Sequence, residues 1–340
     1  MELGIAFKGD LSMDRTIELC KRAEAGGFSY VWFFDSHILW SDPYTRMAVC
    51  MDRTENLRFG PLVTNPKVRD WSVNASMWAT LLEIGEGRFD LAVGRGDSSM
   101  RVMGKKPATI AHTIEYCDAM RELVCGNTVQ YAECPEPVYL EWTQKWDLTI
   151  WIAAYGPKAL KMAGEHGDGL VIQLGDPGLC EWLGGQARDA RSAIGKSAAD
   201  YRVLACAPVW VGDKDRGIDQ TKWFPALVGN HVADIIEKYG SGTDLVPDSM
   251  TTYIDRRRGV GAGGEGYDYR QHGEVKSDNT YYISDEITES FCILGEAPEH
   301  VDRLEQLRES GVTQFTIYLT GGDEERIVKE YAENVIPHCS

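Results

Sequence analysis

The chain has 340 residues, of which 43% are hydrophobic, 26% charged and 10% aromatic, so it can bury a large core and wholesale disorder is excluded. Its formal net charge is −17, from 35 basic and 52 acidic side chains, which argues against binding nucleic acid or an anionic membrane through bulk electrostatics. An anionic cofactor would therefore have to be held by local groups rather than by the field of the whole molecule.

The cysteines and histidines limit the class of protein further. The nine cysteines are odd in number and contain no C-x-x-C pair, which favours reduced thiols in a cytoplasmic protein over a disulfide framework or a zinc ribbon. The N-terminus shows no signal-peptide pattern, and no apolar run approaches the ~20 residues that span a bilayer. The seven histidines are scattered without H-x-H or H-E-x-x-H spacing, so no metal site is expected.

Short apolar runs alternate with longer helical patterns. In chain order they predict a strand at 3–7, a helix at 12–25, strands at 30–34 and 58–63, a helix at 72–84, a strand at 89–93, a helix at 107–125, a strand at 149–153, a helix at 157–166, strands at 169–173 and 203–211, a helix at 298–310 and a strand at 314–319. Eight short, continuously apolar strands in this order predict an α/β fold, a (β/α)₈ TIM barrel, as one domain over 1–340. A doubly wound open sheet is the alternative, although no G-x-G-x-x-G follows the first strand.

Residues 213–290 interrupt the alternation, because they are too long for a simple crossover between the seventh and eighth strands. They contain a Gly-rich run at 259–264 that is followed by several tyrosines. Loops that follow strands lie on the active face of a barrel, so this insertion is a candidate active-site lid. A decorative or subunit-facing insertion is the alternative.

The segment after the second predicted strand carries the first candidate catalytic groups, since active groups of such barrels lie at the C-terminal ends of strands. His37, near Asp35, is a candidate general acid or base because imidazole titrates near neutral pH. A hydrogen-bonded structural histidine is the alternative. Trp40 and Trp71 are candidates for the wall of an aromatic substrate pocket, or for buried core.

Two later strand ends are candidates for holding a ligand. Gly94 and Gly96 would let the backbone approach a flat ligand closely. Arg95 either pairs with a phosphate or carboxylate or forms a surface ion pair, and Asp97 either caps a turn or hydrogen-bonds a ligand. The segment 156–158, Gly-Pro-Lys, opens a helix whose first N–H groups would suit a phosphate.

These segments together resemble the luciferase-like monooxygenase superfamily, nearest the branch of the methylenetetrahydromethanopterin reductases. The resemblance is carried by the runs 27–35, 60–66, 87–97 and 156–169 and by the tail pattern of 295–298 with 311–312. It covers most of the chain apart from 213–290. The order and spacing of the runs make the match specific, rather than any single motif.

The resemblance implies a cofactor ring that lies across the C-terminal face of the barrel, over a non-proline cis peptide at Leu62–Val63. The implied cofactor-binding residues are Leu62, Val63, Thr64, Asn65, Gly94, Arg95, Gly96, Ala154, Gly156, Pro157 and Lys158. The implied catalytic residues are Asp35, His37 and Asp97. One departure puts the role of His37 in doubt, because Ser36 separates it from Asp35 where deazaflavin-dependent relatives tend to have the two adjacent.

The chemistry implied by the resemblance has two versions. The first is a flavin-dependent oxidoreductase that acts as a two-component monooxygenase, using reduced FMN from a separate flavin reductase and O₂ on a small organic substrate. The alternative is a coenzyme F-420 (deazaflavin)-dependent dehydrogenase or reductase, which transfers hydride without O₂. A non-catalytic flavin-binding relative and a metal-dependent hydrolase are the remaining classes. Family members are commonly dimers, so a homodimer is expected.

Overall fold

Eight parallel strands form one continuous sheet in the computed structural model, which describes residues 1–131, 134–228 and 267–339. The sheet order is β3-β2-β1-β10-β7-β6-β5-β4. The strands are β1 (Glu2–Phe7), β2 (Tyr30–Phe33), β3 (Arg58–Pro61), β4 (Leu91–Val93), β5 (Ile150–Ala153), β6 (Gly169–Ile172), β7 (Arg202–Ala207) and β10 (Gln314–Leu319). Parallel bridges from Phe59 to Phe89 and from Thr64 to Val93 join the two edge strands. The sheet therefore closes, and the predicted (β/α)₈ barrel is confirmed over the open sheet.

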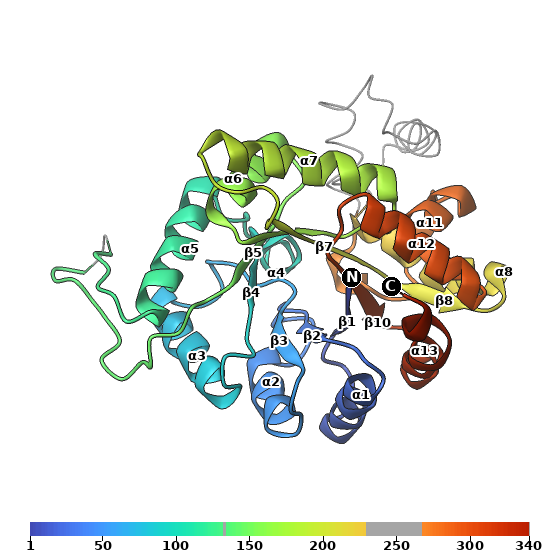
Figure 1. Ribbon diagram of the computed structural model, residues 1–340, viewed down its shortest axis with the longest axis horizontal. Coiled ribbons are helices and arrows are strands. Elements are labelled where there is room, and N and C mark those ends of the chain that lie inside the picture. Colours follow the sequence, from blue (N-terminus) through green and yellow to red (C-terminus); the bar gives the residue numbers. More distant parts are fainter. Residues whose placement is uncertain (132–133, 229–266, 340) are drawn as a thin grey trace.

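The helices form a ring around the barrel (Figure 1). They are α1 (Met13–Ala25), α2 (Pro43–Asp52), α3 (Trp71–Ile84), α5 (Ile110–Val124), α6 (Pro157–His166), α7 (Pro177–Ala193), α12 (Ala297–Glu309) and α13 (Glu324–Glu330), while the short α4 (Asp97–Arg101) lies at the barrel mouth. The chain continues after α13 into a π-helical turn η4 (Tyr331–Val335) and a short 3₁₀ turn η5 (Ile336–His338). Among the described helices, none is long and apolar enough to cross a membrane.

The strands are buried on both faces, which explains why they are continuously apolar rather than alternating. All four residues of β2 and all six of β10 are buried. Inside the barrel Trp32 meets Trp151 edge to face, with ring centroids 6.3 Å apart. A packed interior of this kind fills the barrel and leaves its mouth as the place for a ligand.

The seventh strand was predicted as one element over 203–211, and this prediction is wrong. The barrel strand β7 ends at Ala207, and after Pro208 the chain forms β8 (Val209–Val211), which pairs in parallel with β9 (Ile293–Gly295) outside the barrel. Proline has no N–H to give to a strand ladder, so Pro208 marks the point where the chain leaves the sheet.

The predicted insertion begins and ends at this small β8–β9 ribbon. Its described parts contain α8 (Lys214–Thr221), two short 3₁₀ turns, η2 (Tyr269–Gln271) and η3 (Asp278–Thr280), and α11 (Asp285–Phe291). The side chain of Trp223 stacks at 6.5 Å on Tyr318 of β10, so this part of the insertion packs on the barrel. The Gly-rich run 259–264 lies outside the described residues, and a lid role for the insertion stays a prediction.

Six of the described helices have no counterpart in the predicted elements, namely α2, α4, α7, α8, α11 and α13. Two of them carried a local signal, because Asp42-Pro43 and Asp176-Pro177 each place an N-cap aspartate before a proline at the first helical position. The helix α4 has only five residues, which is too short for a periodic pattern.

Candidate active site

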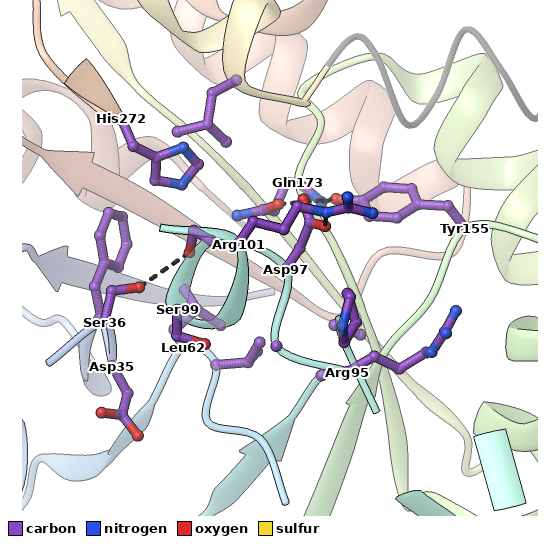
Figure 2. A pocket seen from close by; sticks show the side chains of 18 of the residues that line it. Asp35, Ser36, Leu62, Arg95, Asp97, Ser99, Arg101, Tyr155, Gln173 and His272 are labelled. Carbon is purple, nitrogen blue, oxygen red and sulfur yellow. Dashed lines mark hydrogen bonds and ion pairs between the residues drawn. The ribbon is translucent and has the colours of Figure 1, made fainter. Parts of the chain in front are cut away.

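A pocket of about 360 Å³ opens at the C-terminal ends of the barrel strands, and we refer to it as the mouth pocket. Its volume lies in the range of small-molecule and cofactor sites. Ten residues of the predicted site line it: Asp35, Trp40, Leu62, Val63, Gly94, Arg95, Gly96, Asp97, Ala154 and Gly156. They come from the segments that follow β2, β3, β4 and β5, so the tertiary fold gathers four strand ends into one cavity (Figure 2).

The floor of the mouth pocket is an apolar bulge beside two glycines. The peptide bond between Leu62 and Val63 is cis, as the family resemblance implies. A Cβ at Gly94 would lie 2.7 Å from Cγ2 of Val63, and one at Gly96 would lie 2.7 Å from Cγ of Asn65. Gly96 also has a φ of +85°, which side chains disfavour. Glycine at both positions therefore lets the segment after β4 pass this close to the bulge.

Two predicted cofactor ligands lie behind this floor rather than on it. Thr64 is fully buried, and its hydroxyl donates to Oδ2 of Asp35 at 2.7 Å. Asn65 is 1% exposed, and its amide donates to the hydroxyl of Ser99 at 2.9 Å. Neither side chain lines the pocket. Through these hydrogen bonds they instead position the bulge and the Gly94–Gly96 segment.

Asp35 is occupied by structural partners. Its Oδ2 accepts from the hydroxyl of Tyr44 at 2.6 Å and from Nη1 of Arg69 at 2.8 Å, in addition to Thr64. Burial raises the pKa of the Tyr44 phenol well above its usual value, so this hydroxyl remains a donor. The carboxylate of Asp35 points away from the other labelled side chains of the pocket (Figure 2). This geometry favours a positioning role for Asp35 over direct proton transfer.

His37, the predicted acid or base, is exposed and does not line the mouth pocket. The chain turns after β2, and the N–H groups of Leu39 and Trp40 both bond to the carbonyl of Ser36. In this turn Ser36 lines the pocket, and its hydroxyl lies 3.0 Å from that of Ser98 (Figure 2). Residue order alone could not tell which of two adjacent side chains points inward.

Asp97 opens the short helix α4 at the pocket wall. Its carboxylate forms an ion pair with Arg101, one turn further on, and accepts from the hydroxyl of Tyr269 at 3.3 Å. Arg101 also lines the pocket, although nothing in the sequence pattern singled it out. Asp97 thus links the strand-end segment to the described part of the insertion.

The far end of the mouth pocket is suited to an anion. Gly156 is the N-cap of α6 and has no side chain to accept from the first N–H groups of the helix, while Pro157 fills the first helical position. The Nε of Arg95 donates to the carbonyl of Ala108 at 2.6 Å, which fixes the guanidinium at the pocket edge. Lys158 is exposed and does not line the cavity, and neither does Pro157.

A buried polar chain forms another wall, which sequence reasoning missed. The hydroxyl of Tyr155 donates to Oε1 of Gln173 at 3.2 Å, and the Gln173 amide donates to the hydroxyl of Tyr318 at 2.8 Å. Tyr155 and Gln173 both line the pocket. Burial raises the pKa values of both tyrosines well above the usual range, so their phenols stay protonated. Their positions directly after β5 and in β10 were a signal that could have been used.

Of the two tryptophans predicted to line the pocket, one does so and the other does not. Trp40 lines the mouth pocket, and its ring lies 6.2 Å from the imidazole of His272, which lines the pocket as well. Trp71 does not line the pocket. It is the first residue of α3, is 8% exposed, and stacks on Tyr131 with the ring centroids 4.0 Å apart.

In the described part of the chain, no group of three or more His, Cys, Asp or Glu side chains could hold a metal ion, and all nine cysteines are free thiols.

The chain is similar to known proteins in both sequence and structure. Residues 1–314 match the model of the luciferase-like monooxygenase family. A 5,10-methylenetetrahydromethanopterin reductase of Archaeoglobus fulgidus is 26% identical over 350 residues, covering 99% of each chain. An F-420-dependent secondary alcohol dehydrogenase, solved with an F-420–acetone adduct, superposes with a TM-score of 0.78 at 19% identity, covering 100% of this chain and 99% of that one.

A monooxygenase from Streptomyces bottropensis superposes less closely. Its TM-score is 0.69 at 16% identity, with 100% of both chains covered. Identities this low establish a shared fold only, whereas the family match extends over most of the chain. With the closed barrel, the cis Leu62–Val63 bulge and the family match in agreement, the chain belongs to the luciferase-like monooxygenase family of oxidoreductases.

Proposed function

We propose that this chain is a hydride-transfer oxidoreductase that binds the deazaflavin coenzyme F-420 in the mouth pocket and acts on a small organic substrate. The observation that carries the proposal is the flat floor of Leu62, Val63, Gly94 and Gly96, which runs toward the uncapped N-terminus of α6. The F-420-dependent dehydrogenase supports the deazaflavin over FMN, because it superposes more closely on this chain than the monooxygenase does.

The residues present fit the planar part of such a coenzyme. A flat tricyclic ring needs a wall without side chains on one face, and a Cβ at Gly94 would collide with Val63 in that space. Ala153 and Ala154 continue the wall with the smallest side chains that carry a Cβ. Larger residues at these positions would occupy the volume that the ring needs.

The residues also fit the anionic tail. The dipole of α6 favours a negative group at Gly156, because no side chain caps that end of the helix. Arg95 adds a cation at the same pocket. These local groups oppose the formal charge of −17 of the molecule, which disfavours anions at long range.

A bound deazaflavin supplies hydride chemistry, accepting or donating two electrons with one hydrogen. The protein has to position the substrate carbon against the ring, exclude water and move one proton. The apolar side chains of Phe34, Trp40 and Leu227 line the pocket and restrict water access. The hydroxyls of Ser36 and Ser98 are placed to hydrogen-bond a polar substrate atom.

The monooxygenase reading, favoured on sequence grounds, has weaker support. FMN is also a planar tricycle with a phosphate, so the pocket floor does not separate the two cofactors. The solved structures with the higher TM-scores favour F-420. A hydride-transfer enzyme needs no O₂, and a separate flavin reductase is then unnecessary. A homodimer stays a prediction, which the mass of the protein in solution would test.

The test is a titration of the purified protein with F-420 and with FMN, each oxidised and reduced, followed by tryptophan fluorescence. Trp40 lines the pocket, so a planar ligand there is expected to quench it. We expect tight binding of F-420 and weak binding of both forms of FMN. Tight binding of reduced FMN together with O₂ consumption would instead support the monooxygenase.

A matched pair of glycine variants locates the binding site. Gly94→Ala is expected to weaken F-420 binding by roughly tenfold, because the added methyl group overpacks against Val63. Gly185→Ala in α7 is the control, since a Cβ there meets nothing within 4 Å. Thermal unfolding of each variant separates lost binding from lost folding. Equal affinities in the two variants would place the coenzyme elsewhere.

A further inference from the structure

The described part of the insertion brings a histidine into the mouth pocket. His272 follows η2, and its imidazole lines the cavity on the side of Ser36 (Figure 2). Among the histidines that the structure describes, His272 is the one that lines this pocket. His37, the histidine that the sequence predicted as the acid or base, is exposed and lies outside the mouth pocket.

The ring of His272 is held on several sides. Its Nδ1 lies 3.1 Å from the hydroxyl of Tyr267, and its ring lies 6.2 Å from Trp40 and 6.1 Å from Tyr269, centroid to centroid. A hydroxyl can both donate and accept, so the Tyr267 bond persists with either tautomer of the imidazole. The ring therefore keeps its orientation in the pocket with either tautomer.

The backbone next to His272 is tied to the barrel. Gly273 has a φ of +76°, and its carbonyl accepts from Nζ of Lys8 at 3.3 Å. Lys8 directly follows β1 and is only 4% exposed, which is uncommon for a lysine. The insertion thus has a fixed point on the barrel at the residue after the histidine.

We propose that His272 is the catalytic acid–base residue of this enzyme and that the substrate pair is an alcohol and its carbonyl compound. The inference rests on the proposed function. In the oxidation, the C–H bond of the alcohol breaks, and the hydrogen leaves with its electron pair to oxidised F-420. The O–H proton passes to the imidazole and the C=O bond forms. In the reverse reaction the imidazolium would return the proton to the developing alkoxide, and the hydride would come from the bound, reduced deazaflavin.

The titratable and charged groups near His272 have to be considered in any pH profile. Among the described residues, those facing it, or linked to it through Tyr269 or Gly273, include Tyr267, Tyr269, Asp97, Arg101, Lys8, Asp10 and Glu274. Of these, Asp97 lines the same pocket and bonds to Tyr269. A change at Asp97 would thus alter the pH profile as well, whereas His37 lies outside this group.

The first experiment needs no turnover. Histidine labelled with ¹³C at Cε1 gives one resonance per imidazole, and the signal of His272 is the one lost in His272→Asn. We expect saturating oxidised F-420 to shift this resonance and its titration midpoint, and to leave the resonance of His37 unmoved. An unmoved His272 signal, while tryptophan fluorescence reports bound F-420, would overturn the proposal and keep the proposed function. No F-420 binding by the wild-type protein would overturn both.

The second experiment measures the rate with F-420 and a panel of small alcohols and carbonyl compounds. His272→Asn is expected to lower kcat by about 10²-fold or more and to remove one limb of its pH profile, with F-420 affinity within about twofold. His37→Asn is the matched control and is expected to change neither. A kcat for His272→Asn within twofold of wild type would overturn the acid–base role, and no turnover across the panel would overturn the alcohol–carbonyl pair.

Discussion

At the scale of single residues, Asp35 shows how a predicted catalytic group can serve the site indirectly. Its side chain has no exposed surface and accepts hydrogen bonds from Tyr44, Thr64 and Arg69. Thr64 belongs to the segment that forms the pocket floor, so the carboxylate ties that floor to α2 and to Arg69. A buried ion pair with several hydrogen bonds is costly to break from one side, because the remaining charge is left without compensation.

We expect Asp35→Asn to lower the free energy of unfolding by about 3 kcal/mol, since it leaves the guanidinium of Arg69 without its buried partner. Urea unfolding measures the change. Asp42→Asn is the control, because Asp42 faces the same guanidinium from an exposed position and Asn keeps the N-cap of α2. A similar loss in both variants would show that burial is not the cause.

At the scale of elements, His300 joins the outer ribbon to the end of the chain. It is fully buried in α12, with Nε2 3.0 Å from the carbonyl of Trp210 in β8 and Nδ1 2.8 Å from the hydroxyl of Tyr331. Burial lowers the pKa of His300 from 6.5 to about 4. The folded structure therefore contains the neutral ring, and protonation of His300 destabilises the folded state.

The lowered pKa predicts a pH-dependent stability. Between pH 6.5 and 4 the unfolded chain binds a proton at His300 that the folded chain does not, so stability is lost as the pH falls through this window. The full loss from this group is about 3 kcal/mol by the linkage relation. The free energy of unfolding, measured with urea from pH 7 to 5, is expected to lose this dependence on pH in His300→Gln and to keep it in His338→Gln. An unchanged slope in His300→Gln would assign the effect to other groups.

At the scale of the whole molecule, the charge of −17 and the anion-binding end of the pocket act in opposite directions. The long-range field repels a phosphate-bearing coenzyme, while Arg95 and the start of α6 attract it at short range. Salt screens the long-range part more strongly, because the Debye length falls from ~30 Å at 0.01 M to ~8 Å at 0.15 M.

We therefore expect the association rate of F-420 to rise by a factor of about two or more between 0.01 M and 0.15 M salt. Stopped-flow tryptophan fluorescence measures it, and a deazaflavin without the phosphate-bearing tail is the control, whose rate should not change. A rate that falls with salt would mean that the basic groups at the pocket dominate the field at long range as well.

The sequence by itself determined the barrel, its eight strands and the segments that form the mouth pocket, because burial on both faces of a parallel strand leaves a continuous apolar run followed by a polar strand end. It also placed the cis bulge at Leu62–Val63, through the family resemblance. Only the tertiary structure decided which side chain of each segment faces the cavity. Ser36 points inward in place of His37, and Trp71 packs against Tyr131.

For the same reason the local sequence pattern did not identify His272 and Gln173 as residues of the site. His272 lies more than two hundred residues along the chain from Trp40, and only folding brings the two rings within 6.2 Å. Side-chain direction at a turn depends on backbone dihedrals, and contacts across the barrel depend on how distant strands are placed. Neither quantity is encoded in the spacing of residue types, so the sequence determined where the site lies and the fold decided which residues form it.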